Sequence, residues 1–92
     1  MTLWTIRAQY DDEAHVWYSV EGDIPGLNID AATIEELVGK AAAQLPDLLD
    51  IHARDFIDRE RLEGPHRIRV LAFHEQVYDV AAGRWFRATR RG

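Results

Sequence analysis

Apolar and polar residues alternate along most of the chain and recur at helical spacing in its middle. Between Leu3 and Tyr10, the residues Trp4, Ile6 and Ala8 fall on one side of an extended backbone. Period-two spacing of this kind is typical of a half-buried strand, so we expect the Trp4 side to meet the core. The same pattern predicts further strands over residues 15–21, 27–30 and 66–78.

A capped helix follows the third predicted strand. The run Thr33-Ile34-Glu35-Glu36 fits a capping box, in which the Thr33 side chain accepts from the Glu36 amide and the Glu36 carboxylate reaches back. Apolar residues then recur along one stripe, at Ile34, Leu37, Val38, Ala41, Leu45, Leu48 and Leu49. Pro46 predicts a kink, with the helix continuing to about Ile51. A break followed by a short second helix is the alternative.

These elements follow one another in the order β-β-β-α-β. We expect an antiparallel sheet with one long helix packed on its face, which is an α+β two-layer sandwich. Pro25 and Gly26 suit a type II turn before the third strand, because proline presets φ and glycine can take a positive φ. The charged segment 52–65 is expected to extend the helix in part. Its contacts with the body are expected from Phe56, Ile57 and Leu62.

The length of 92 residues suits one domain and is too short for two good cores. We place that domain at residues 1–79 and a basic C-terminal tail or edge strand at residues 80–92. The absence of cysteine excludes disulfides and thiolate catalysis. No apolar run approaches the ~20 residues of a membrane helix, and no basic segment of a signal peptide follows Met1. A cytoplasmic protein is therefore expected.

Charge is divided unevenly along the chain. Residues 1–79 hold all 16 acids and seven of the 11 bases, a net charge of −9, whereas residues 80–92 hold only bases, a net charge of +4. The tail arginines are Arg84, Arg87, Arg90 and Arg91, and they flank Trp85 and Phe86. Arginines beside aromatic rings are typical of a nucleic-acid contact. A solvated or exchanged tail is the simpler interpretation.

Both faces of the predicted sheet carry apolar residues, although one helix can cover only one face. Trp17 and its neighbour Tyr18 point to opposite sides of the second strand, and the pattern leaves open which of the two joins the core. We expect Trp17, Leu71 and Phe73 to form an exposed apolar patch. A homodimer or higher symmetric oligomer would bury it, with Trp85 and Phe86 packed on or across the interface.

The polar residues form no recognisable reactive constellation. A two-metal nuclease needs converging carboxylates, and the candidates Asp11, Asp12, Glu13, Asp23 and Asp30 fall mainly in predicted turns, where acids serve backbone geometry. The histidines His15, His52, His66 and His74 lack the spacing of a helical metal site. Ser19 lacks the glycine-flanked context of a nucleophile. We therefore expect no catalytic residue, no cofactor and no metal ion.

The order of these motifs resembles that of HicB-like antitoxin domains. Such domains carry a tyrosine or tryptophan in the second strand, a D-x-P-G turn, and T-x-E-E at the start of an apolar helix. The matching segments here are Tyr18, Asp23-Ile24-Pro25-Gly26 and Thr33-Ile34-Glu35-Glu36-Leu37. The segments VWYSVEGDIPGL and LPDLLDI are especially similar to a short, stand-alone branch of unknown function. The likeness covers roughly residues 3–52.

The resemblance implies a degenerate ribonuclease H-like fold without catalysis. It also implies a partner, a HicA-like toxin, which is a small mRNA-cleaving protein with a double-stranded-RNA-binding fold. Full HicB antitoxins usually carry a C-terminal DNA-binding domain, and residues 75–92 are too short for one. The leading hypothesis is therefore a non-enzymatic, antitoxin-like protein-binding module of a toxin-antitoxin system. The alternative is a small nucleic-acid-associated or regulatory protein that uses the arginine-rich tail.

Overall fold

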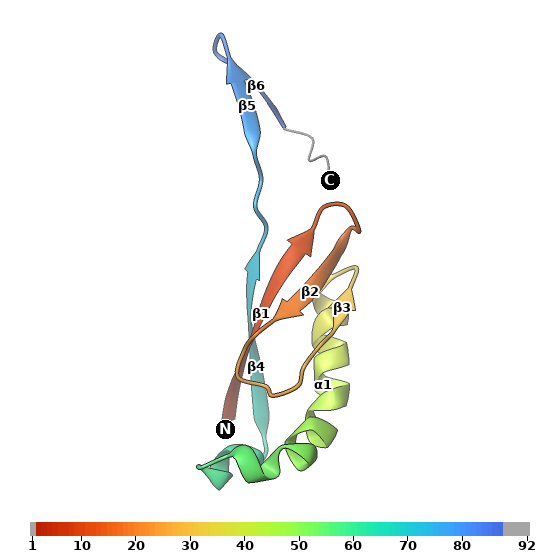
Figure 1. Cartoon of the computed structure of the whole chain (residues 1–92), viewed down its shortest axis with the longest axis vertical. Coiled ribbons are helices and arrows are strands. Elements are labelled where there is room, and N and C mark those ends of the chain that lie inside the picture. Colours follow the sequence, from red (N-terminus) through yellow and green to blue (C-terminus); the bar gives the residue numbers. More distant parts are fainter. Residues whose placement is uncertain (1, 88–92) are drawn as a thin grey trace.

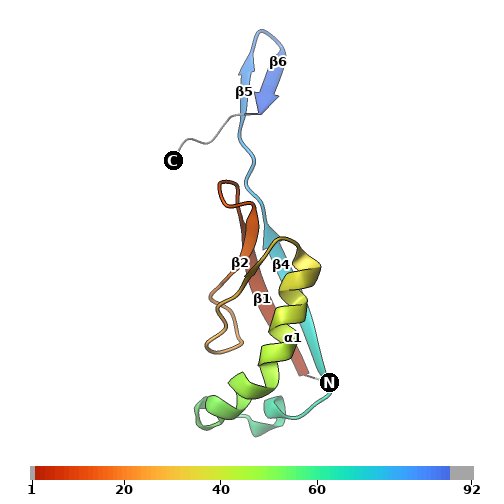
Figure 2. The ribbon, with the colours of Figure 1, turned by 90° about the vertical axis from the view of Figure 1, so that its right-hand side faces the viewer.

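The computed structural model describes residues 2–87, which form a four-stranded sheet, one long helix and a separate β-hairpin (Figure 1). In chain order the elements are β1 Thr2–Asp11, β2 Val16–Val20, β3 Asp30–Ala31, α1 Ile34–Ile51, the 3-10 turns η1 Ala53–Asp55 and η2 Arg59–Leu62, β4 His66–Phe73, β5 Tyr78–Ala81 and β6 Arg84–Arg87. The helix packs on one face of the sheet (Figure 2). The predicted α+β two-layer sandwich is confirmed.

The sheet has the strand order β3-β2-β1-β4 and is mixed rather than antiparallel. β2 is antiparallel to both β1 and β3. β4, however, runs parallel to β1, with Thr2 opposite His66 and Gln9 opposite Phe73. The expectation of a wholly antiparallel sheet is therefore wrong. The physical reason is the crossover: α1 carries the chain back along the sheet, so the chain enters β4 at the end where β1 begins.

The hydrophobic core lies between β1 and α1. On β1 the buried residues are Trp4, Ile6 and Ala8, as the alternation predicts. Every residue of the predicted helical stripe is buried or half-buried, and the fully buried ones are Leu37, Ala41, Leu45 and Leu49. Ile24, Ile29 and Ala31 close the core from the segment between β2 and α1. The residues that repeat every second position on β1 therefore pack against the residues that repeat every 3.6 positions on α1.

The helix begins and ends where its sequence predicts. The Thr33 hydroxyl accepts a hydrogen bond from the Glu36 amide at 3.1 Å, so one amide of the first turn is satisfied. The helix continues through Pro46 to Ile51, and the alternative of a break is wrong. Pro46 and Ala42 both lie on the exposed side of the helix, where water can bond the Ala42 carbonyl that proline leaves free.

Residues 52–65 do not extend the helix. They form η1 and η2, and the second of these turns starts where the Asp58 carboxylate accepts from the Glu60 amide at 3.0 Å. Phe56 and Leu62 pack against the core, as expected, but Ile57 is fully exposed, so its predicted contact is wrong. A segment this rich in charge follows the core surface with only a few apolar contacts.

The Pro25-Gly26 turn is confirmed in its main feature, because Gly26 has a φ of +73°. A side chain there would be strained, and its Cβ would also lie only 2.9 Å from His52 Nε2. The turn therefore packs closely against the end of α1. The third strand is shorter and later than predicted, at Asp30–Ala31 instead of residues 27–30.

β5 and β6 form a hairpin that projects from the end of β4, away from the rest of the body (Figures 1 and 2). Residues 78–87, which we call the arm, contribute to overall extents of 58 × 21 × 21 Å. The arm turns at Ala82 and Gly83, which both have positive φ, as in a type I′ hairpin turn. The predicted division after residue 79 falls inside β5. Within residues 2–87, no helix has the length and apolar character needed to cross a membrane.

Candidate protein-binding face

The helix covers one face of the sheet and leaves the other toward solvent (Figure 2). We call the latter the open face. It consists of the residues that alternate with the core residues on β1, β2 and β4, namely Leu3, Thr5, Arg7, Gln9, Val16, Tyr18, Val20, Arg67, Arg69, Leu71 and Phe73. An uncovered sheet face normally carries polar side chains. Here six of the eleven positions are apolar or aromatic.

Cross-strand pairing arranges the open face in rows. In one row Gln9 lies between Tyr18 on β2 and Phe73 on β4. The Tyr18 hydroxyl donates to Gln9 Oε1 at 2.8 Å, which orients the ring over the sheet. Tyr18 is 36% exposed and Phe73 is 55% exposed. Two accessible aromatic rings therefore flank one amide group.

The next row places Arg7 between Val20 and Leu71. Beside this row lies an open hollow of about 470 Å³, lined by Thr5, Arg7, Glu21, Gly22, Asp23, Arg69 and Leu71. The Arg69 guanidinium donates to Thr5 Oγ1 from Nε at 3.2 Å and from Nη2 at 2.9 Å. The hollow and its surroundings therefore combine apolar side chains with acidic and basic ones. This composition is typical of a protein–protein interface rather than of an enclosed small-molecule site.

The predicted patch of Trp17, Leu71 and Phe73 does not form. Trp17 pairs with Tyr10 and with the buried Ala31, so its ring lies on the helix face and packs against the core. The Trp17 ring centroid lies 5.1 Å from that of Tyr10. Tyr18, not Trp17, accompanies Leu71 and Phe73. The sequence left this choice open because it depends on strand register, and a shift of one residue exchanges the two faces.

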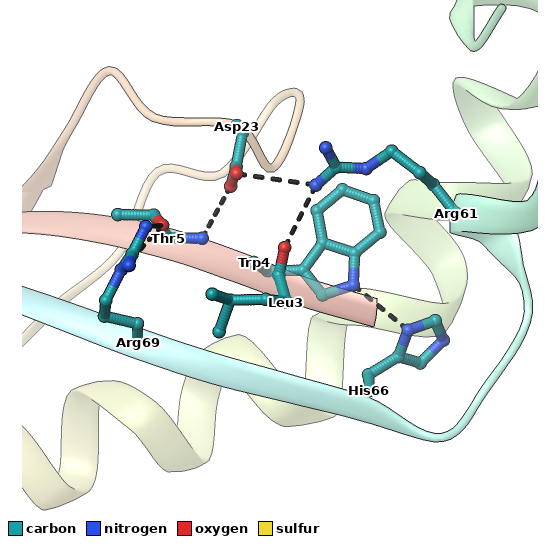
Figure 3. Close-up of polar contacts among 7 residues, drawn as sticks. All are labelled: Leu3, Trp4, Thr5, Asp23, Arg61, His66 and Arg69. Carbon is teal, nitrogen blue, oxygen red and sulfur yellow. Dashed lines mark hydrogen bonds and ion pairs between the residues drawn. The ribbon is translucent and has the colours of Figure 1, made fainter. Parts of the chain in front are cut away.

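Two side chains complete the sheet where β2 ends (Figure 3). β2 pairs with β1 only from Arg7 onward, so the first half of β1 lacks a strand on that side. Asp23 Oδ1 accepts from the Thr5 amide at 2.7 Å, and Arg61 Nη2 donates to the Leu3 carbonyl at 3.1 Å. Asp23 Oδ2 lies 3.5 Å from the same Nη2. The pair therefore satisfies backbone groups that an edge strand would leave free.

Trp4 joins this edge to the segment that precedes β4 (Figure 3). Its Nε1 donates to His66 Nδ1 at 3.0 Å, which requires the His66 tautomer with the proton on Nε2. The guanidinium carbon of Arg61 lies 4.6 Å from the Trp4 ring centroid, and Phe56 packs edge-on at 5.7 Å. Sequence reasoning missed Arg61 because one cation–π contact leaves no periodic signal.

The carboxylates considered for a nuclease site have separate structural contacts. Asp11 Oδ1 accepts from the amides of Glu13 and Ala14 and closes the turn after β1. Asp12 lies 3.1 Å from His74 Nε2, and Asp30 lies 3.9 Å from Lys40 Nζ. Asp23 is held by Thr5 and Arg61. Within residues 2–87, no three histidine or acidic residues are grouped so that they could hold a metal ion.

The predicted tail residues lie on or beyond the arm. Trp85 is 68% exposed, and its ring contacts Tyr78 of the same hairpin at 5.4 Å. Arg84 is exposed at the start of β6. Only the backbone of Phe86 and Arg87 is described, and Arg90 and Arg91 lie outside the described residues. The structure therefore separates Trp85 from the open face of its own chain.

Comparison with known proteins places this fold in a family. The solved structure of a hypothetical protein, TTHA1013, from the extremely thermophilic bacterium Thermus thermophilus shares 36% sequence identity with this chain. The match has a TM-score of 0.62 and covers 82% of this chain and 97% of that one. No curated protein matches the sequence. The family model of DUF1902, a domain of unknown function, matches residues 3–60, so the chain belongs to the DUF1902 family.

Proposed function

We propose that this protein is a non-enzymatic, antitoxin-like module that binds a small HicA-like toxin in the cytoplasm. The observation that carries the proposal is the open face, where Tyr18, Leu71 and Phe73 are exposed around polar side chains. Tyrosine and other aromatic residues are common at the energetic centres of protein interfaces. The described acids nearby serve turns and strand edges, which argues for binding rather than catalysis.

Charge supports a basic partner. Residues 1–79 carry a net charge of −9. A toxin that cleaves mRNA has to present basic side chains to phosphates, so its RNA-binding surface is positively charged. The open face itself carries Arg7, Arg67 and Arg69, so the acidic charge of the domain lies around this face and would attract the basic surface at long range rather than by pairing at the centre of the contact. The HicB-like order of motifs around Asp23-Ile24-Pro25-Gly26 and Thr33 supports the same class of partner.

The test is to express the chain together with a small HicA-like protein encoded in a neighbouring reading frame. We expect a complex by native mass spectrometry and inhibition of RNA cleavage by the toxin. Tyr18→Arg should weaken the complex by at least ~10-fold, because it places a cation at the centre of the contact. Gln44→Arg is the matched control, since it makes the same change of charge on the exposed side of α1. Equal affinity of the two variants, or no complex at all, would refute the proposal.

The alternative function, binding of nucleic acid through the tail, is favoured by the exposed Trp85 beside Arg84. Stacking on a tryptophan with phosphate contacts from arginines would give affinity that falls steeply with salt. Fluorescence anisotropy with a short single-stranded RNA tests this directly. Salt-dependent binding that is lost in R84A/R87A, together with no toxin complex, would favour this alternative.

A further inference from the structure

The arm exposes an apolar face. Val80 lies opposite Trp85 in the β5–β6 pairing, and Tyr78 contacts the Trp85 ring, so these three residues share one side of the hairpin. Their exposed fractions are 44% for Tyr78, 73% for Val80 and 68% for Trp85. A two-stranded hairpin is at best marginally stable alone in water and needs a further strand or a packing surface. The arm is therefore expected to pack against another strand or surface.

β4 offers the missing strand. It lies at one end of the strand order, so one of its edges is unpaired within residues 2–87. Arg67 and Arg69 place charges along its first half, a common protection against further pairing. The second half, residues 70–73, has the sequence VLAF and carries no charge. The unprotected part of the edge is thus the part next to the arm.

The arm cannot easily use the β4 edge of its own chain. The link between β4 and β5 is His74-Glu75-Gln76-Val77, which contains none of the glycine, asparagine, aspartate or proline residues that form tight hairpin turns. The link instead continues almost in line with β4 (Figures 1 and 2). His74 is held to its own body by Asp12 at 3.1 Å and by the Tyr10 ring at 4.5 Å, which fixes the direction in which the chain leaves β4.

We propose that two copies of this chain exchange arms, so that β5 of each pairs antiparallel with the β4 edge of the other. The two-fold axis passes through the pair formed by the two copies of Glu75. The backbone groups that point to the free edges belong to Val70 and Ala72 on β4 and to Tyr78 and Val80 on β5. Ala72 therefore lies opposite the second copy's Tyr78, and Val70 lies opposite its Val80. The contact is closed and self-complementary, because each chain gives one arm and receives one.

This register extends the helix side of the sheet across the subunit boundary. Val70 is half-buried against the core and Ala72 is exposed, and paired residues on adjacent strands share a face. The exchange therefore sets Tyr78, Val80 and Trp85 of one copy beside Val70 and Ala72 of the other. Net charges of +4 in residues 80–92 and −9 in residues 1–79 favour the same contact. The proposal rests on the β4 edge and the arm, and it does not depend on the toxin.

The first test changes the link of the full-length chain. In E75N/Q76G, Asn-Gly lies within the five-residue loop 73–77 and lets the arm fold back on its own β4 in the same register, because hairpin loops of this length are built around a turn and glycine can take a positive φ. E75A/Q76A is the matched control, since it removes the same side chains without adding a turn former. Light scattering without toxin should give twice the chain mass of 10.6 kDa for the natural chain and E75A/Q76A, and a single chain mass for E75N/Q76G.

Three results would overturn the proposal. They are a monomeric natural chain at micromolar concentration, a dimer that persists in E75N/Q76G, and loss of the dimer in both variants. Circular dichroism shows that each variant is folded before its mass is interpreted. None of these measurements involves toxin binding, so failure of the exchange and failure of the proposed function are separable.

The second test locates the contact, and it is simple because the chain has no cysteine. V70C and V80C proteins of different mass are unfolded together, refolded and mildly oxidised. Directly opposed residues on antiparallel strands have Cβ atoms ~4.5–5.5 Å apart, so we expect a disulfide-linked heterodimer. V70C with Q44C is the control, because Gln44 lies on the exposed side of α1. A heterodimer yield no higher than this control would refute the register.

Discussion

Replacing Arg61 with alanine tests whether side chains rather than a strand complete the first half of β1. Arg61 comes from η2, a turn that periodicity does not reveal, and it reaches the Leu3 carbonyl, the Asp23 carboxylate and the Trp4 ring. If these contacts hold the segment 52–65 to the sheet, the substitution destabilises the whole domain. If the segment is only loosely attached, the substitution has little effect.

The magnitude follows from the three contacts. The hydrogen bond from Nη2 to the Leu3 carbonyl at 3.1 Å contributes ~1 kcal/mol, because a half-exposed donor keeps some access to water. The cation–π contact at 4.6 Å adds about 0.5–1 kcal/mol. The ion pair with Asp23 adds little, on the order of 0–0.5 kcal/mol, since the two side chains are 38% and 40% exposed. Arg61 Nε is buried and has no hydrogen-bond partner within residues 2–87, and its desolvation offsets part of the gain.

We therefore expect Arg61→Ala to lower the free energy of unfolding by ~1–2 kcal/mol, which corresponds to a Tm lower by about 4–16 °C for a domain of this size. Urea and thermal melts followed by circular dichroism measure both quantities. Arg59→Ala is the matched control, because Arg59 is exposed in the same turn and carries the same charge. Asp23→Asn separates the ion pair from the rest. An Arg61→Ala midpoint equal to that of Arg59→Ala would show that these contacts do not hold the segment.

Two further predictions concern the start of the helix and the absence of catalysis. Thr33→Ala should destabilise the domain by ~1 kcal/mol, because it removes the acceptor for the Glu36 amide, and an unchanged urea midpoint would argue against that cap. The protein should not cleave single- or double-stranded RNA or DNA with Mg²⁺ or Mn²⁺. Turnover that disappears in Asp11→Asn or Asp23→Asn would instead establish a nuclease, although both carboxylates already bond backbone amides.

Sequence predicts well those parts of the fold in which buried residues recur at regular spacing along one side of an element. Trp4, Ile6 and Ala8 alternate because β1 is covered on one side only, and this periodicity survives any choice of partner strand. The stripe of α1 and its Thr33 cap are similarly local, so the helix was predicted from end to end. The helix continues through Pro46, as predicted, and the kink expected there stays a prediction.

The direction of a strand and its register with its neighbours, in contrast, cannot be predicted from the spacing of apolar residues. β4 has the same alternation whether it runs parallel or antiparallel to β1, so its parallel pairing was missed. The choice between Trp17 and Tyr18 depends on pairing with β1 and β3, which is a tertiary property. The contacts of Arg61 come from single side chains in irregular turns. For the candidate site, sequence therefore identified Leu71 and Phe73 but placed them beside the wrong aromatic residue.

The edges of the sheet explain why the arm matters. At one end β3 is only two residues long, and a short edge strand offers little to pair with. The first half of β1 is completed by Asp23 and Arg61, and the first half of β4 carries Arg67 and Arg69. Each of these features either satisfies the free backbone groups of one edge or discourages another strand from pairing with it. Residues 70–73 have no such protection, and the same chain continues from them into a hairpin whose apolar side lacks a cover. In a monomer, the unprotected β4 edge would be open to aggregation and the arm would lack a packing surface. In the proposed exchange between two copies, the arm of each chain covers the β4 edge of the other, so one contact resolves both problems.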